Sequence, residues 1–89
     1  NVLAESQIEL SRGFASSRND RFALGAWYDG MGRAPLLSGV AAAFECESGG
    51  SHLTGDHRLF VGRIVRVTDG ALEPLVFNAG RYHAVGEIL

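Results

Sequence analysis

The segment that most limits the fold is LFVGRIVRVT, residues 59–68, because it is apolar on both faces. Its residues alternate with the period of a β-strand, and large apolar side chains occupy both sets of positions. The two sets are Leu59, Val61, Val65 and Val67 on one face, and Phe60, Gly62, Ile64 and Arg66 on the other. A strand with two apolar faces has to be covered on both sides. We predict a long strand that is covered partly by polypeptide outside this chain.

Two further strands are predicted around this segment. Residues 40–47 alternate in the pattern of a half-buried strand, and SGGSHLTGD, residues 48–56, supplies glycines and small polar residues for a reversal. After the long strand, Asp69-Gly70 favours a tight hairpin into a short last strand within LVFNAG, residues 75–80. The fold is therefore expected to be mainly β, with three antiparallel strands. Three strands are too few to close a barrel.

One short helix is predicted ahead of the strands. Ser6 and Glu9 fit a capping box, so the helix is expected to begin near Ser6 and to end near residue 16 or 17. Leu10 and Phe14 are four positions apart and form a stripe that can face a core. Residues 18–37 contain three glycines and a proline without a sustained period. They are predicted to be a loop with a short helical turn at DRFA.

Composition narrows the class of protein. A chain of 89 residues is one domain or part of one, and it buries only ~60–65% of its unfolded surface, which favours association. The single cysteine, Cys46, is expected in the core, and with no apolar leader or long apolar run we expect a cytoplasmic protein away from membranes. The net charge of −2 argues against nucleic-acid binding. The start at Asn1, with Met31 as the only methionine, indicates a fragment.

Most catalytic and metal motifs are missing. No Cys-x-x-Cys or His-x-x-x-His pair predicts a metal site, and no Gly-x-Ser-x-Gly elbow predicts a nucleophilic serine. All eight basic residues are arginines, which suit phosphate or carboxylate, although a high-GC genome gives the same bias. The serines and arginines of SRGFASSRNDRF, residues 11–22, either hold a phosphate or form a solvated face.

Two segments that contain a histidine each have two possible interpretations. His57 either reaches over the end of the sheet or completes an ordinary turn beside Asp56. GRYH, residues 80–83, either stacks on a planar ligand or forms a partly exposed terminal strand.

Six separated segments resemble one family. The segments NVLAESQIELSRGFAS, DRF, W, APLLSGVAAAFEC, GDHRLFVGRIV and FNAGRYH stand in the order seen in short-chain flavin reductases, from Asn1 to about His83. The chain resembles the C-terminal half of such a reductase, so residues 1–89 are expected to be the C-terminal portion of one domain without its N-terminal half. The resemblance implies an FMN-binding split β-barrel, usually a homodimer with flavin near the subunit interface.

The resemblance also implies roles for individual residues. Asn1, Val2 and Leu3 match a segment beside the flavin, and Ser11, Arg12 and Phe14 match a segment bordering the flavin tail. This sequence departs at Gly13, where relatives often carry arginine or another long residue. On the nicotinamide side lie His57, Arg81 and Tyr82. His57 is expected to position the nicotinamide, and no side chain is expected to be catalytic, because hydride transfer is the chemistry of the two cofactors.

The implied function is NADH- or NADPH-dependent reduction of free FAD or FMN, which supplies reduced flavin to the oxygenase component of a two-component monooxygenase. The resemblance decides neither the flavin nor the coenzyme, although Arg58, Arg63 and Arg81 are candidates to meet a 2′-phosphate. One alternative is a split-barrel protein that binds flavin without turnover. Another is a β-rich interaction module.

Overall fold

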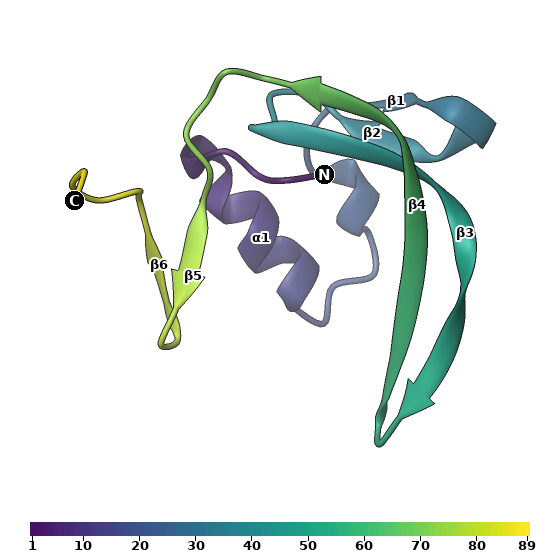
Figure 1. Cartoon of the computed structure of the whole chain (residues 1–89). Helices are drawn as coiled ribbons and strands as arrows, with labels where there is room; N and C mark the ends of the chain where they lie inside the picture. Colours follow the sequence, from purple (N-terminus) through teal and green to yellow (C-terminus); the bar gives the residue numbers. More distant parts are fainter.

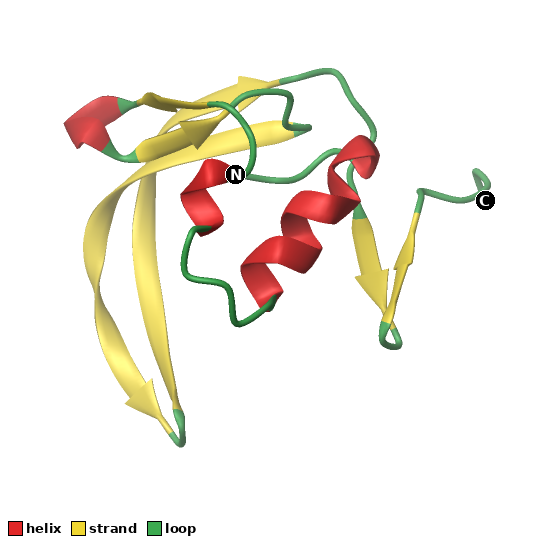
Figure 2. Cartoon of the chain, turned by 180° about the vertical axis from the view of Figure 1, so that it is seen from behind, coloured by secondary structure: helices red, strands yellow, loops and turns green.

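The computed structural model describes all 89 residues and is mainly antiparallel β with one short helix, as predicted (Figures 1 and 2). Six strands form three separate two-stranded sheets, which pair β1 with β2, β3 with β4, and β5 with β6. In chain order the elements are η1 (Glu5–Gln7), α1 (Ile8–Ala15), η2 (Arg21–Ala23), β1 (Trp27–Asp29), η3 (Met31–Arg33), β2 (Pro35–Leu37), β3 (Ala42–Thr54), β4 (His57–Asp69), β5 (Val76–Asn78) and β6 (Arg81–His83). The η elements are single 3-10 turns.

The ribbon of β3 and β4 is the largest element, and it is longer than the sequence pattern predicted. The strands pair from Ala42 with Asp69 to Thr54 with His57, so the reversal expected over residues 48–56 is wrong for most of that range. Gly49 and Gly50 lie within β3, where the register shifts between Ser48 and Ser51. A Cβ on Gly49 would lie 3.1 Å from the Val61 carbonyl oxygen. The glycines therefore allow close strand approach at a bulge and do not form the turn.

The hairpin predicted at Asp69-Gly70 is also wrong, and so is the three-stranded arrangement. After Asp69 the chain crosses to the N-terminal segment, where Glu5 N donates to Glu73 O (3.0 Å) and Leu75 N donates to Leu3 O (2.8 Å). β5 then pairs with β6 instead of β4. The start of β3 is bonded in turn by Val2, whose N donates to Ala42 O (2.8 Å). The N-terminal segment thus takes up pairing positions that a continuous sheet would have used.

The region predicted as a loop contains more structure than expected. The helical turn at DRFA is confirmed as η2, but β1 and β2 in the same region were not predicted. Trp27 pairs with Leu37 and Asp29 pairs with Pro35. Each of these strands has only three residues, which is too short for an alternating pattern to stand out.

The core is small and lies where β2 meets the start of β3. Leu36, Leu37, Val40 and Ala43 form it, with Leu3, Leu10 and Trp27 packed against it. The predicted inward stripe of the helix is confirmed at Leu10. Beyond this core the ribbon is largely open: Leu53 is 74% exposed and Phe60 is 75% exposed. Cys46 is exposed as well, contrary to the expectation of a core residue, and its partner across the ribbon, Ile64, is 53% exposed.

One buried charge connects the ribbon to the β1–β2 sheet. The Glu45 side chain is 4% exposed, accepts a hydrogen bond from Met31 N (2.8 Å), and lies 3.4 Å from Nη1 of Arg66. We expect Glu45→Gln to lower the free energy of unfolding of the intact protein by about 1–2 kcal/mol, since it keeps the size but removes a charged, hydrogen-bonded partner. Chemical denaturation measures this change.

Glu47 supplies a matched control for that substitution. It also lies on β3 and pairs with an arginine of β4, Arg63, but its side chain is 62% exposed. Glu47→Gln is expected to change stability by about 0.5 kcal/mol or less. Equal losses in the two variants would show that burial of Glu45 contributes nothing.

Candidate functional site

The candidate site is built where helix α1 meets strand β6. Ser11 Oγ and the Tyr82 hydroxyl lie 2.8 Å apart although the residues are 71 positions apart in the chain. The guanidinium carbon of Arg12 lies 5.6 Å from the centroid of the Tyr82 ring, which is within cation–π range. Ser11 and Arg12 had been predicted on the flavin side and Tyr82 on the nicotinamide side. The structure brings the three together. Arg81 precedes Tyr82 on β6 and is exposed, and alternation along the strand places its side chain on the opposite face.

The polar groups of α1 suit an anion. Arg12 Nη1 bonds Glu9 Oε1 at 2.6 Å, but both side chains are mainly exposed, at 58% and 84%. Such surface pairs contribute only about 0–1 kcal/mol, so Arg12 can exchange Glu9 for a phosphate at little cost. Gly13, where the sequence departs from the family pattern, is buried beside Leu24. A Cβ there would lie 2.1 Å from Leu24 Cδ1, so a larger residue requires the Leu24 side chain to move.

The residues that follow the C-terminal end of helix α1 form hydrogen bonds within the chain. Ser16 Oγ donates to Gly13 O at 2.6 Å, and Arg21 donates to Ser16 O. Arg18 donates to both carboxylate oxygens of Asp20, at 2.6 and 3.0 Å, and these hydrogen bonds lower the pKa of Asp20. Ser11 is likewise bonded to Tyr82, and Arg12 and Arg18 both pair with exposed carboxylates, so both interpretations of residues 11–22, phosphate binding and a solvated face, stand.

The segment of Asn1, Val2 and Leu3 forms part of the frame of the fold. The Asn1 side chain accepts from Leu37 N (3.0 Å) and donates to Pro35 O (3.2 Å), which fixes it to β2. Val2 and Leu3 use backbone groups to bond β3 and Leu75. A contact from this segment to a flavin would come from the groups that remain, such as the partly exposed Val2 side chain.

Phe14 lies in an aromatic cluster with Phe22 and Trp27. Its ring meets Phe22 edge-on, with centroids 5.4 Å apart, and lies 5.8 Å from Trp27. Phe22 remains 61% exposed, so the cluster presents an aromatic edge to solvent. The sequence pattern alone did not predict that these three rings pack together. The spacing of the DRF and W segments after Phe14 was the available indication of this cluster.

The structure does not bring His57 to the other candidate residues. His57 is the first residue of β4, its side chain is 83% exposed, and Nδ1 lies 2.6 Å from Asp56 Oδ1. Figures 1 and 2 both show the β3–β4 turn at the far end of the ribbon, away from α1 and the β5–β6 hairpin. Within this chain His57 is therefore a turn residue with a free imidazole face.

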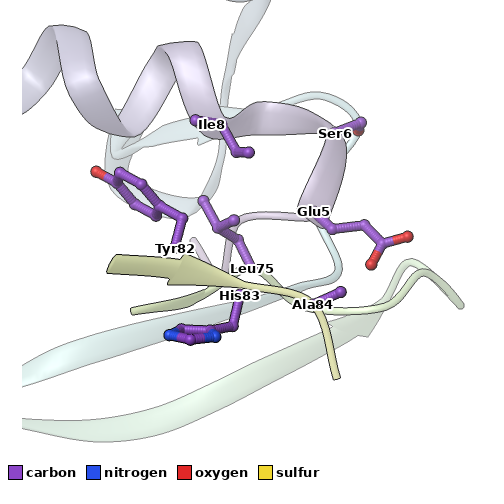
Figure 3. Close-up of a pocket in the computed structure, with 7 residues that line it drawn as sticks. All are labelled: Glu5, Ser6, Ile8, Leu75, Tyr82, His83 and Ala84. Atoms are coloured by element: carbon purple, nitrogen blue, oxygen red, sulfur yellow. The ribbon is translucent and has the colours of Figure 1, made fainter. Parts of the chain in front are cut away.

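A cavity of about 440 Å³ lies between η1, the start of α1 and β6. Its lining residues are drawn in Figure 3: Glu5, Ser6, Ile8, Leu75, Tyr82, His83 and Ala84. Tyr82 thus borders both this cavity and the contact with Ser11. Most of the lining could not be predicted from the sequence, because the residues come from both ends of the chain.

Two other kinds of feature are not found in the structure. No three or more His, Cys, Asp or Glu side chains gather as they would around a metal ion. None of the helices has the length and apolar character of a membrane span.

Comparison with known proteins gives one consistent result. Residues 1–86 match the family model described as "Flavin reductase like domain". The chain is 36% identical over 84 residues to the stachydrine N-demethylase reductase subunit of Rhizobium meliloti, covering 94% of this chain and 36% of that protein. It is 33% identical over 88 residues to an FMN reductase (NADH) of Ancylobacter novellus, covering 96% of this chain and 49% of the relative.

A solved structure agrees with these matches. The NADH:FAD oxidoreductase of Streptomyces globisporus C-1027, in complex with NAD and FAD fragments, superposes with a TM-score of 0.83 at 31% identity. The match covers 94% of this chain and 52% of that one. The chain spans about a third to a half of the length of these relatives.

Proposed function

The chain belongs to the flavin reductase like domain family, and from this premise we propose that it is the C-terminal portion of an NADH-dependent flavin reductase. The enzyme would reduce free FAD or FMN and pass reduced flavin to the oxygenase component of a monooxygenase. Relatives named as a reductase subunit and as an FMN reductase support this proposal. The observation that carries it is the contact between Ser11 and Tyr82, which joins the segments implied for flavin and nicotinamide.

The protein has to contribute little chemistry to this reaction. NADH gives a hydride to oxidised flavin and becomes NAD⁺, while a proton from solvent completes the reduced flavin. The side chains need only hold two flat rings face to face at about 3–3.5 Å. In this proposal Ser11 and Arg12 bind the flavin tail beside Phe14, with Asn1, Val2 and Leu3 framing the flavin. Arg81, Tyr82 and His57 orient the nicotinamide, and none acts as an acid or base.

The names of relatives favour NADH over NADPH in this proposal, since one is an FMN reductase (NADH) and another is an NADH:FAD oxidoreductase. The arginines do not decide between the coenzymes. Arg63 pairs with Glu47 and Arg58 donates to Ser51 Oγ at 3.0 Å, and a 2′-phosphate can displace such surface partners at little cost. We expect kcat/KM for NADH to exceed that for NADPH by about tenfold, which corresponds to about 1.4 kcal/mol. Steady-state oxidation of each coenzyme tests this, and equal values would contradict it.

The exposed faces of the β3–β4 ribbon are proposed to be covered by the rest of the enzyme. We propose that residues 1–89 are completed into one split barrel by a further N-terminal portion and that the enzyme is a homodimer. The exposed apolar residues of β3 and β4 support this, since a surface of this kind marks an interface. His57 would then reach a site formed with a second subunit. The single cysteine agrees with a reducing compartment, and we place the enzyme in the cytoplasm.

Activity of the intact protein tests the proposal. Purified protein is mixed with NADH and either FMN or FAD, and the loss of nicotinamide absorbance is followed. We expect oxidation that depends on flavin and saturates with it. Bound flavin without NADH oxidation would instead support the flavin-binding alternative. Absence of both flavin binding and oxidation would support the interaction module.

A further inference from the structure

The β5–β6 hairpin is attached to the rest of the chain at two places. At its base, Leu75 N donates to Leu3 O (2.8 Å) and Glu5 N donates to Glu73 O (3.0 Å). Along its arm, the attachment to α1 is made by side chains, through Ser11 and Tyr82. Figure 1 shows the hairpin projecting beside α1 and separate from the β3–β4 ribbon. Backbone bonds fix the base, and the arm depends on a side-chain bond.

The surroundings of Tyr82 are already occupied in this structure. Phe77 lies across the hairpin with its ring centroid 5.1 Å from that of Tyr82, at an interplanar angle of 59°. Arg12 lies over the ring, and the hydroxyl is bonded to Ser11. Such packing fixes the rotamer of Tyr82. Held by these three neighbours, Tyr82 can set the position of its strand while its side chain also borders the cavity.

We propose that Tyr82 is a positioning residue whose hydroxyl, through Ser11, fixes the nicotinamide-side strand β6 relative to the flavin-side helix α1. This inference rests on the proposed function. Hydride transfer depends steeply on the separation of the two rings, and a misplacement of about 1 Å can cost about 100-fold in rate. One hydrogen bond between the elements that carry the two ring sites therefore acts on the chemical step. It need not change how tightly either ring binds.

Tyr82→Phe in the intact protein tests this role, because it removes the hydroxyl and keeps the ring. At saturating flavin we expect kcat for NADH oxidation to fall about fivefold, the equivalent of a net hydrogen bond, while flavin affinity changes less than about twofold. Tyr28→Phe is the matched control. Tyr28 is the other tyrosine, it is 51% exposed on β1, and the substitution is expected to leave kcat unchanged.

Variants at Ser11 separate positioning from a loss of structure. Ser11→Ala at saturating flavin should lower kcat as Tyr82→Phe does, Ser11→Thr should keep most of it, and the double variant should be no slower than either single one. A wild-type kcat in Tyr82→Phe, or additive losses in the double variant, would overturn the inference. Failure of the wild-type protein to oxidise NADH with flavin would instead overturn the proposed function.

Discussion

Replacing Gly70 with alanine is expected to lower the free energy of unfolding of the intact protein by about 3 kcal/mol, the upper range for overpacking. A Cβ at this position would lie 2.0 Å from the Val40 carbonyl oxygen and 3.2 Å from that of Ala41. Both are backbone atoms, and Gly70 N itself donates to Ala41 O at 2.9 Å. The methyl group cannot be accommodated by a side-chain rotation, so the end of β4 must move away from the core.

Gly86→Ala is the control for this substitution. A Cβ at Gly86 would meet no atom within 4 Å, and the residue lies in the C-terminal segment after β6. It makes the same change in composition and should alter stability by no more than about 0.5 kcal/mol. Chemical denaturation of both variants gives the difference. Similar midpoints for the two variants would mean that the close approach of Gly70 to Val40 does not exist in solution.

The crossing at Gly70 also shows what the sequence pattern could not predict. The alternation over residues 59–68 correctly placed β4, because it depends on neighbours in sequence. The helix lies close to its predicted range, but the predicted capping box of Ser6 and Glu9 is wrong: α1 begins at Ile8, and Gln7 Oε1 accepts from Ala4 N (2.9 Å) one turn earlier. Asp69-Gly70 has the composition of a hairpin turn, but the choice of partner is made by Val2, Leu3 and Glu5, far away in the chain. The composition of a turn depends on neighbouring residues only, so it cannot predict this choice between distant pairing partners.

The candidate site likewise combines features that the sequence could predict with features that it could not. Resemblance assigned Ser11 and Tyr82 to opposite sides of a site, and the contact between them depends on tertiary structure that no spacing expresses. For His57 the outcome is the reverse. Its segment is among the most distinctive in the sequence, yet this chain leaves its imidazole 83% exposed at the end of the ribbon. A residue with such a segment, whose side-chain partner in this chain is the adjacent Asp56, is expected to act on another part of the assembly.

His57→Ala is therefore expected to raise KM for NADH about tenfold, a loss of about 1.4 kcal/mol of binding, with flavin affinity unchanged. His52→Ala is the matched control, since His52 is an exposed histidine of the same ribbon and pairs with Leu59. Steady-state kinetics with NADH and a flavin titration measure both effects. Equal KM values for wild type and His57→Ala would remove His57 from the nicotinamide site.

Mixed dimers test whether His57 acts across the proposed subunit interface. In a dimer of one His57→Ala and one Tyr82→Phe subunit, a shared site combines His57 of one subunit with Tyr82 of the other, so one site is intact and the second carries both changes. Random assembly of equal amounts then leaves about a quarter of all sites intact. Coexpressed subunits should therefore show more activity at low NADH than either variant alone. If both residues serve one site within a subunit, no site is intact and mixing gives only the average of the two variants.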